Sequence, residues 1–364
     1  MASVQTGTKV IDGDGHIFED FDAIARFIPQ MYRHPLKQDQ TNSRIFPPLD
    51  HLHGSRESVS PAGLSGRGRD IGPEEWMAFL DEAQIDTTVL YPTAALAYGK
   101  IVSIDWAVAA TTAYNDWLSE TYLKRDSRFR GMALIPGQDP AAAVIELRRA
   151  VEELGMSGAM LPSNGFDTDL GSPVYWPIYE EADRLGCAIA VHGGCHDGLG
   201  MDRLNRYAPV HALGHPLGVM ISFASIIFNG VMDHFPNAKY AFLEGGVAWV
   251  LMALERFDRS HETHMEFDPL KRWGPQIGEK VSDYIIRHAR ENRLFIGIEG
   301  DEPLLPTAIE ALGAQSFVFS SDFPHEVSNE MIKDELDGIR TNEQLTTSAR
   351  EALLRGSAAS LYRL

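Results

Sequence analysis

Residues 186–194 read GCAIAVHGG, an apolar run over 188–192 that ends in a histidine and two glycines. A strand that is apolar at every position is typical of a parallel sheet buried on both faces. Seven similar runs recur along the chain, at 9–14, 87–91, 131–135, 158–161, 240–244, 294–299 and 317–320. Amphipathic helical segments separate them, at 74–84, 104–124, 140–154, 173–185, 213–234, 247–261 and 303–312. Eight such units favour a (β/α)8 TIM barrel over an open doubly wound sheet.

The remaining segments predict a single domain over residues 1–364, built around this barrel. Residues 39–70 are rich in proline and glycine and predict a long loop inserted after the first strand, near the barrel mouth. A loop of this length in a compact domain is usually functional or disordered. Residues 332–364 predict a helical tail packed on the outside. No Gly-x-Gly-x-x-Gly motif follows an early strand, which argues against a dinucleotide-binding domain.

Charge and cysteine content exclude several classes of protein. The chain has 32 Lys and Arg against 51 Asp and Glu, a net charge of −19, so it lacks the basic surface that nucleic acids and acidic membranes attract. Its two cysteines cannot form a disulfide framework, and neither a membrane span nor the apolar core of a signal peptide is expected. We therefore expect a cytoplasmic protein that acts on a small molecule, with no nucleic-acid or membrane partner.

Acidic and histidine side chains stand at the ends of five of the eight predicted strands. The carboxyl ends of barrel strands converge on one face, and barrel enzymes build their chemistry there. The residues at these ends are Asp12, Asp14 and His16 on the first strand, His192 on the fifth, Glu244 on the sixth, Glu299 on the seventh and Asp322 on the eighth. So many titratable groups at one end predict an active site.

Four of these residues have the side chains of a metal site. Asp14 and His16 are two apart on an extended segment, so their side chains point the same way. His192 and Asp322 arrive from other strands. Imidazole and carboxylate ligands suit a divalent cation such as Zn, Fe or Mn, and a cation would offset the repulsion among clustered acids. The sequence therefore predicts a divalent metal ion at the barrel mouth.

The chain resembles the amidohydrolase superfamily, in the branch that includes the aminocarboxymuconate-semialdehyde, resorcylate and carboxyvanillate decarboxylases. Five segments carry the resemblance, in order along nearly the whole chain: IDGDGHIFE at 11–19, AVHGG at 190–194, HFPNAKYAFLEGG at 234–246, SSDFPH at 320–325 and GSAASLY at 356–362. The resemblance implies a barrel with one divalent metal ion, held by Asp14, His16, His192 and Asp322.

Two positions depart from the pattern that many members share. Those members have His-x-His on the first strand, where this chain has Asp14 as the first of the pair. They also have a histidine at the end of the sixth strand, where this chain has Glu244. Both changes make the site more anionic, leave the identity of the metal open and allow a second metal ion bound by Glu244. Relatives are often dimers, so the resemblance also implies a homodimer.

The sequence leaves more than one interpretation open for each of three residues near the predicted site. Glu244 is interpreted as a structural acid at a helix start, as a general acid or base, or as an additional metal ligand. His215, at the start of a predicted helix, either packs on a loop or donates a hydrogen bond to the substrate. His325, three residues after Asp322, either supports the metal-binding acids or is a loop histidine.

Other polar residues are less closely tied to the site. Glu19 either orients His16 or caps a helix. Arg67 and Arg69 are either solvated loop charges or hold a substrate carboxylate, whose geometry the guanidinium group matches. Neither cysteine is expected to be a nucleophile. Five further histidines are expected at the surface: His196, His211, His261, His264 and His288.

The same ligands support two reactions. Hydrolysis needs water activated by the cation, with Asp322 accepting its proton and His215 or the cation stabilising the oxyanion. The bond that is cleaved next to the attacked carbonyl would be that of an ester, a thioester or an amide, or a C–C bond. Decarboxylation needs a substrate carboxylate near the cation and a carboxylic acid that protonates carbon as carbon dioxide leaves. Because the sixth strand lacks the histidine, the sequence favours a hydrolase of a small organic acid or secondary metabolite, with a non-oxidative carboxy-lyase as the alternative. A third hypothesis, a metal-free binding scaffold, would pair the strand-end acids with Arg or Lys, which the neighbouring sequence lacks.

Overall fold

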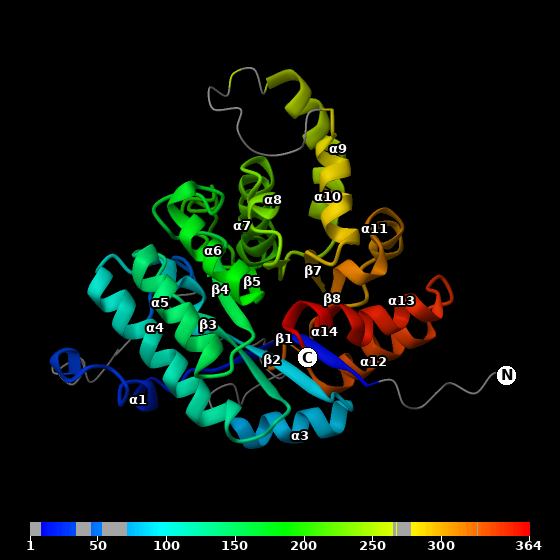
Figure 1. Cartoon of the computed structure of the whole chain (residues 1–364). Coiled ribbons are helices and arrows are strands. Elements are labelled where there is room, and N and C mark those ends of the chain that lie inside the picture. Colours follow the sequence, from blue (N-terminus) through cyan, green and yellow to red (C-terminus); the bar gives the residue numbers. More distant parts are fainter. Residues whose placement is uncertain (1–8, 34–44, 53–70, 265–266, 268–277, 326) are drawn as a thin grey trace.

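Eight parallel strands pair in sequence order in the computed structural model and form the barrel that the sequence predicts (Figure 1). The structure describes residues 9–33, 45–52, 71–264, 267, 278–325 and 327–364. The strands are β1 (Ile11–Ile17), β2 (Thr87–Pro92), β3 (Phe129–Leu134), β4 (Gly158–Pro162), β5 (Ala188–His192), β6 (Lys239–Phe242), β7 (Leu294–Ile298) and β8 (Phe317–Phe319). Backbone hydrogen bonds link the two ends of the sheet, since the N–H of Asp322 donates to the carbonyl of Asp14 (3.1 Å).

Helices follow the strands and surround the barrel (Figure 1). The α-helices are α1 (Phe21–Ile24), α3 (Pro73–Ala83), α4 (Ile104–Leu118), α5 (Pro140–Glu152), α6 (Trp176–Leu185), α7 (Tyr207–Phe228), α8 (Val231–His234), α9 (Ala248–His264), α10 (Val281–Arg290), α11 (Leu305–Leu312), α12 (Asn329–Thr341), α13 (Thr347–Glu351) and α14 (Ser357–Tyr362). Shorter 3-10 or π-helical turns are η1 (Ala94–Lys100), η2 (Ser119–Leu123), η3 (Pro173–Tyr175), η5 (Ala314–Ser316) and η6 (Ala352–Gly356).

Local sequence signals set where several helices begin. Ser103, Asp139 and Ser328 precede α4, α5 and α12, and each side chain accepts a hydrogen bond from a backbone N–H of the first helical turn. Such a cap satisfies a donor that has no partner within the helix and contributes about 1 kcal/mol. Pro140 at the first position of α5 is compatible with the helix for the same reason, because no N–H is needed there.

The strands are buried along their length because side chains fill the barrel and helices cover its outside. Every residue of β1, β4 and β5 is buried. The buried polar side chains in these strands gather near the carboxyl end, where Asp14, His16 and His192 have no exposed surface. Burial of so many titratable groups is costly unless each one finds a partner, and it marks the end of the barrel that carries the site.

Three boundaries of strands and helices differ from the expected ones, and each difference changes where a site residue lies relative to its element. Strand β1 continues to Ile17, so Asp14 and His16 lie inside it, and its register with β2 shifts after Asp12. Strand β6 ends at Phe242, two residues before Glu244. Helix α7 begins at Tyr207, so His215 lies inside the helix and not at its start.

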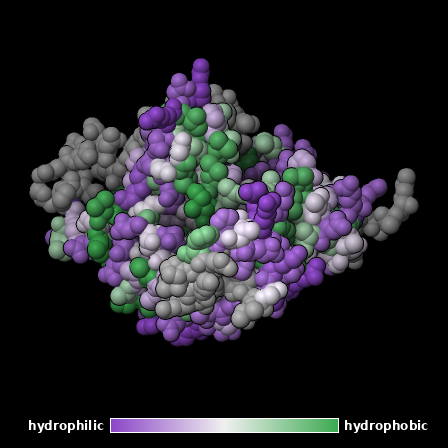
Figure 2. All heavy atoms as spheres, turned by 90° about the horizontal axis from the view of Figure 1, so that it is seen from above, coloured by the Kyte–Doolittle hydropathy of each residue, from purple (hydrophilic) through white to green (hydrophobic). Residues whose placement is uncertain are grey.

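Helix α7 is, within the described residues, the one helix that is long and apolar enough to cross a membrane by length and composition. Its Val219, Phe223 and Ile226 are fully buried in the core, so the apolar composition serves packing in the fold. Seen from above, hydrophilic side chains cover much of the surface and apolar ones lie in smaller groups among them (Figure 2).

The C-terminal helices α12 to α14 form the predicted tail, and the tail reaches further inward than expected. Tyr362 is buried, its hydroxyl donates to the carbonyl of Gly13 in β1 (2.6 Å) and lies 2.8 Å from the hydroxyl of Tyr91 in β2. The tail therefore packs against the barrel strands. His288 was expected at the surface, but it is fully buried in α10, where its ring packs on Tyr284 (4.3 Å between ring centroids).

Candidate metal centre and active site

The first strand supplies two side chains to the barrel mouth. Nδ1 of His16 donates to the carbonyl of Pro92 at the end of β2 (2.7 Å), so the ring carries its proton on Nδ1. Nε2 of His16 is therefore left with a lone pair, 3.6 Å from Oδ1 of Asp14. A backbone carbonyl that fixes the tautomer in this way is the usual support of a metal-binding histidine.

Strand β5 adds a second imidazole with the same arrangement. Nδ1 of His192 donates to the carbonyl of Gly193 (3.0 Å), and Nε2 lies 3.5 Å from Oδ1 of Asp14. The ring stacks on Tyr91 with 5.3 Å between centroids, which holds its plane. Burial lowers the pKa of His192, but the carboxylates of Glu244 and Asp14 outweigh burial and raise it to about 10. The site is therefore strongly attractive to positive charge.

Strand β8 is followed by Asp322, which is turned into the site by an unusual backbone. Its φ is 50°, in the left-handed region that a residue with a side chain seldom adopts, and strain of this kind gathers at functional sites. Oδ1 of Asp322 lies 3.5 Å from Nε2 of His16 and accepts a hydrogen bond from Nδ1 of His325 (2.7 Å). Nε2 of His325 lies 3.0 Å from the hydroxyl of Thr93.

Glu244 also has a left-handed backbone, with φ of 58°, and its carboxylate faces three imidazoles. It lies 3.2 Å from Nε2 of His16 and 3.6 Å from Nδ1 of His192, and it forms an ion pair with Nδ1 of His215. Burial raises the pKa of Glu244, but His192 and His215 outweigh burial and hold it well below its usual range. Glu244 is therefore a carboxylate at neutral pH.

Gly193 makes room for the pair of Glu244 and His215. A Cβ at this position would lie 2.5 Å from Cγ of His215 and 2.8 Å from Oε2 of Glu244. No real side chain fits at these distances, so the glycine lets the imidazole of α7 and the carboxylate after β6 meet beside the end of β5.

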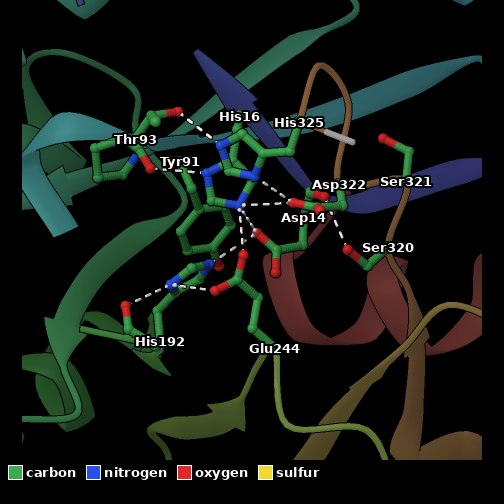
Figure 3. Close-up of polar contacts among 12 residues, drawn as sticks. Asp14, His16, Tyr91, Thr93, His192, Glu244, Ser320, Ser321, Asp322 and His325 are labelled. Carbon is green, nitrogen blue, oxygen red and sulfur yellow. Dashed lines mark hydrogen bonds and ion pairs between the residues drawn. The ribbon is translucent and has the colours of Figure 1, made fainter. Parts of the chain in front are cut away.

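The donor atoms of these residues fit one divalent metal ion (Figure 3). One ligand atom each from Asp14, His16 and His192 lie within 4.8 Å of one another, and a second group joins His16 to Glu244, Asp322 and His325. Both carboxylate oxygens of Asp14 and Nε2 of each histidine of the first group are buried without a hydrogen-bond partner in the structure. Buried polar atoms are rarely left unpaired, so this arrangement is able to hold a cation.

The nearest ion-pair partners of the acids argue against a metal-free scaffold. Within the described residues, the ion pairs of Asp14, Glu244 and Asp322 are all with histidines. A scaffold without a cation was expected to pair these acids with Arg or Lys instead.

Not every candidate residue reaches this centre. The carboxylate of Glu19 accepts hydrogen bonds from the backbone N–H groups of Thr93 (3.2 Å), Ala94 (2.9 Å) and Ala95 (2.8 Å), at the start of η1. This is the geometry of the helix cap, and it positions the loop that carries the partner of His325. Arg67 and Arg69 lie outside the described residues, as does most of the 39–70 loop.

Several residues that contact or support the site were not predicted from the sequence. Thr93 and Tyr91 carry no sequence signal beyond their position at the end of a predicted strand, and Asp12 had been grouped with the strand-end acids without a role. The Asp12 carboxylate is buried, accepts hydrogen bonds from Thr88 (2.6 Å) and Ser321 (2.9 Å), and so ties β1 to β2 and β8. Burial raises the pKa of Asp12 to about 6. His196 was expected at the surface, but only 1% of it is exposed.

Known proteins share this architecture and much of this sequence. The family described as "Amidohydrolase" matches residues 11–364. The chain is 24% identical over 313 residues to the 2-amino-3-carboxymuconate-6-semialdehyde decarboxylase of Dictyostelium discoideum, which covers 85% of this chain and 82% of that protein. It is 28% identical over 314 residues to a gamma-resorcylate decarboxylase of Rhodococcus jostii, which covers 79% of this chain and 86% of that one.

A solved structure has the same fold. The 5-carboxyvanillate decarboxylase of Novosphingobium aromaticivorans, crystallised with bound manganese, matches with a TM-score of 0.74 and 17% identity, over 99% of this chain and 98% of that one. At this identity the likeness shows the fold alone. Together, the relatives are those that the sequence resemblance indicated.

Proposed function

Because the chain belongs to the amidohydrolase family, we propose that it is a metal-dependent carboxy-lyase, which releases carbon dioxide from a small carboxylated aromatic or enoic acid. The sequence favours hydrolysis, because Glu244 stands where many members have a histidine. The two curated relatives match 85% and 79% of the chain and are decarboxylases. They support the alternative reaction over hydrolysis.

One observation carries the proposal: unpartnered, buried ligand atoms from β1 and β5 lie beside two acid–imidazole pairs. The first set suits a cation, and the pairs can hold and move protons. Asp14, His16, His192 and Asp322 would hold one divalent metal ion. When bound, such an ion supplies positive charge that polarises a substrate carboxylate and its neighbouring oxygen.

Decarboxylation breaks the bond between a carbon and its carboxylate and forms a C–H bond, so a side chain must deliver a proton to that carbon. Asp322 is suited to this role in its protonated form, because it is 25% exposed at the barrel mouth and Nδ1 of His325, 2.7 Å from Oδ1, can supply the proton that Asp322 passes to the carbon. The aromatic ring of Tyr91 and the two buried ligand histidines form the floor below it, where water is excluded.

The second acid–imidazole pair faces the same space. Nδ1 of His215 is engaged by Glu244, so Nε2 is the nitrogen left to contact a substrate. A hydrogen bond from this nitrogen would stabilise negative charge that develops on a substrate oxygen as the carboxylate departs. The low pKa of Glu244 keeps its negative charge next to the imidazole, so Oε2 stays an acceptor for Nδ1 of His215.

The test is a product assay on the purified protein loaded with Mn²⁺, Zn²⁺ or Fe²⁺. We expect carbon dioxide from acids of the gamma-resorcylate or 5-carboxyvanillate kind, and in D₂O we expect deuterium on the carbon that lost its carboxylate. Acid release from a panel of esters, thioesters and amides, without carbon dioxide, would establish hydrolysis instead. A protein that retains no metal and gains no activity from these ions would be a scaffold.

Two further predictions concern the protein in solution. We propose a homodimer, which light scattering after size-exclusion chromatography tests directly, and a cytoplasmic location, which cell fractionation tests.

A further inference from the structure

Behind the His215–Glu244 pair lies a third acid–imidazole pair, which is buried and joins elements far apart in the chain. Asp50 belongs to residues 45–52, in the segment after β1, and His196 follows β5. Nδ1 of His196 lies 2.7 Å from Oδ2 of Asp50, and 1% and 3% of the two residues are exposed. A charged carboxylate buried to this degree is costly unless its interactions offset the lost hydration.

The ring of His196 contacts the catalytic side of α7. Its centroid lies 4.9 Å from that of the His215 ring. It also packs on the backbone just before His215, because a Cβ on Gly214 would lie only 2.4 Å from Nε2 of His196. His196 therefore touches both the His215 ring and the turn of helix that carries it, and Asp50 fixes the plane of the His196 ring.

The segment of Asp50 is held by several contacts besides that carboxylate. Nζ of Lys100 donates to the carbonyl of Pro48 (3.0 Å), and the N–H of His196 donates to the carbonyl of Leu49 (3.0 Å). Nε2 of His51 donates to the carbonyl of Leu204 (2.9 Å). Oδ1 of Asp50 accepts a hydrogen bond from the N–H of Leu52 (2.7 Å) within the segment, while Oδ2 orients the imidazole of His196.

We propose that Asp50 and His196 are positioning residues for the His215–Glu244 pair, an inference that rests on the proposed function of that pair. The χ2 torsion of a histidine is broad and has little preference of its own, so His215 keeps Nδ1 on Glu244 only if its ring is packed from the other side. His196 supplies that packing. Asp50, in the segment after β1, then contributes to the active site through His196, from the far side of α7.

His196→Ala removes the packing, and the double variant Asp50→Ala/His196→Phe restores a ring without a buried charge. We expect kcat of the metal-loaded His196→Ala enzyme to fall roughly 10- to 100-fold, the usual cost of losing a residue that orients an active-site side chain, with KM and metal content unchanged. The double variant should recover part of the loss. Thermal melting shows which variants fold. If His196→Ala does not fold, Asp50→Asn is the milder variant, because it keeps the His196 ring and removes only the charge of its partner.

His51→Ala is the matched control, because His51 anchors the same segment without contacting His196 or His215. We expect its kcat to match the wild type. An equal loss in His51→Ala and His196→Ala would mean that the segment acts only through its anchoring, and would overturn the proposal.

A crystal structure of metal-loaded His196→Ala gives a result that needs no substrate. We expect the His215 ring to leave Glu244. If it keeps Nδ1 on Glu244, the proposal fails whatever the activity. If the ring moves but the wild type decarboxylates none of the acids tested, the positioning stands and the proposed reaction is wrong.

Discussion

Glu244→Gln separates the three roles that the sequence left open for this acid. The substitution keeps the size of the side chain and one carbonyl oxygen but removes the negative charge. In the wild type that charge faces His16 at 3.2 Å and His192 at 3.6 Å and pairs with His215. The amide NH₂ that replaces one oxygen donates and cannot accept, so Nδ1 of His215 keeps an acceptor only if the remaining carbonyl oxygen faces it.

The expected size of the effect follows from the pairing with His215. A hydrogen bond to a charged group contributes about 1.5–3 kcal/mol, and the carboxylate of Glu244 is such a group. Loss of a general acid or base lowers kcat by roughly 10²- to 10⁴-fold, which is about 3–5 kcal/mol in the barrier. The upper end of the first range meets the lower end of the second, so we expect kcat to fall by roughly 10²-fold or more when metal is saturating.

The assay has two steps. Metal content after dialysis and titration with Mn²⁺ give the affinity, which should weaken roughly 10- to 100-fold because a nearby negative charge is lost. Carbon dioxide release at saturating Mn²⁺ then gives kcat. Glu153→Gln is the matched control, since Glu153 is an exposed acid at the C-terminal end of α5 and its loss should leave kcat unchanged. Recovery of the wild-type kcat of Glu244→Gln at high Mn²⁺ would make Glu244 a metal ligand, and no change in either quantity would refute the reasoning.

Three more predictions follow from the same geometry. Asp322→Asn should abolish carbon dioxide release while the melting temperature stays near that of the wild type, because the change removes a charge at a strand end and no core volume; retained turnover would contradict the assignment. Gly193→Ala should lower kcat at constant metal content, since the new Cβ would lie 2.5 Å from His215 and 2.8 Å from Glu244, and an unchanged kcat would show that the contact between them is dispensable. Burial lowers the pKa of His288 from 6.5 to about 2. Below pH 6.5 the unfolded chain therefore binds a proton at His288 that the folded chain does not bind. The free energy of unfolding falls as the pH falls, by up to about 1.4 kcal/mol per pH unit. Urea unfolding of the apoprotein between pH 7 and pH 5 should show a flatter pH dependence in His288→Asn, and equal slopes would count against a neutral buried histidine.

The strand order and the gathering of the candidate side chains at the barrel mouth were predictable, because both depend on patterns that are local in the sequence. A run such as 188–192 is apolar at every position, and in a barrel its last residue faces the mouth. Once the barrel is recognised, Asp14, His16, His192 and Asp322 must converge, whatever lies between them in the chain. The candidate metal centre was therefore visible as four residues on three strands.

The partners of these ligands were not predictable in the same way. His215 was placed at a helix start, whereas α7 begins eight residues earlier, at Tyr207. The expectation for His196 was wrong because its burial depends on Asp50, 146 positions away in the chain. Nothing in the local pattern of hydrophobic residues reports a contact between two polar side chains on separate loops.

The amino-acid order alone determined the barrel, its strand sequence and the residues that its mouth collects, since hydrophobic periodicity dictates which face of each element is buried. Only the tertiary structure decided which nitrogen of each histidine is free, that Glu244 pairs with His215, and that Glu19 caps a helix start. These depend on distances of a few ångströms between residues remote in sequence, where a single rotamer or a missing Cβ, as at Gly193, determines whether two groups meet.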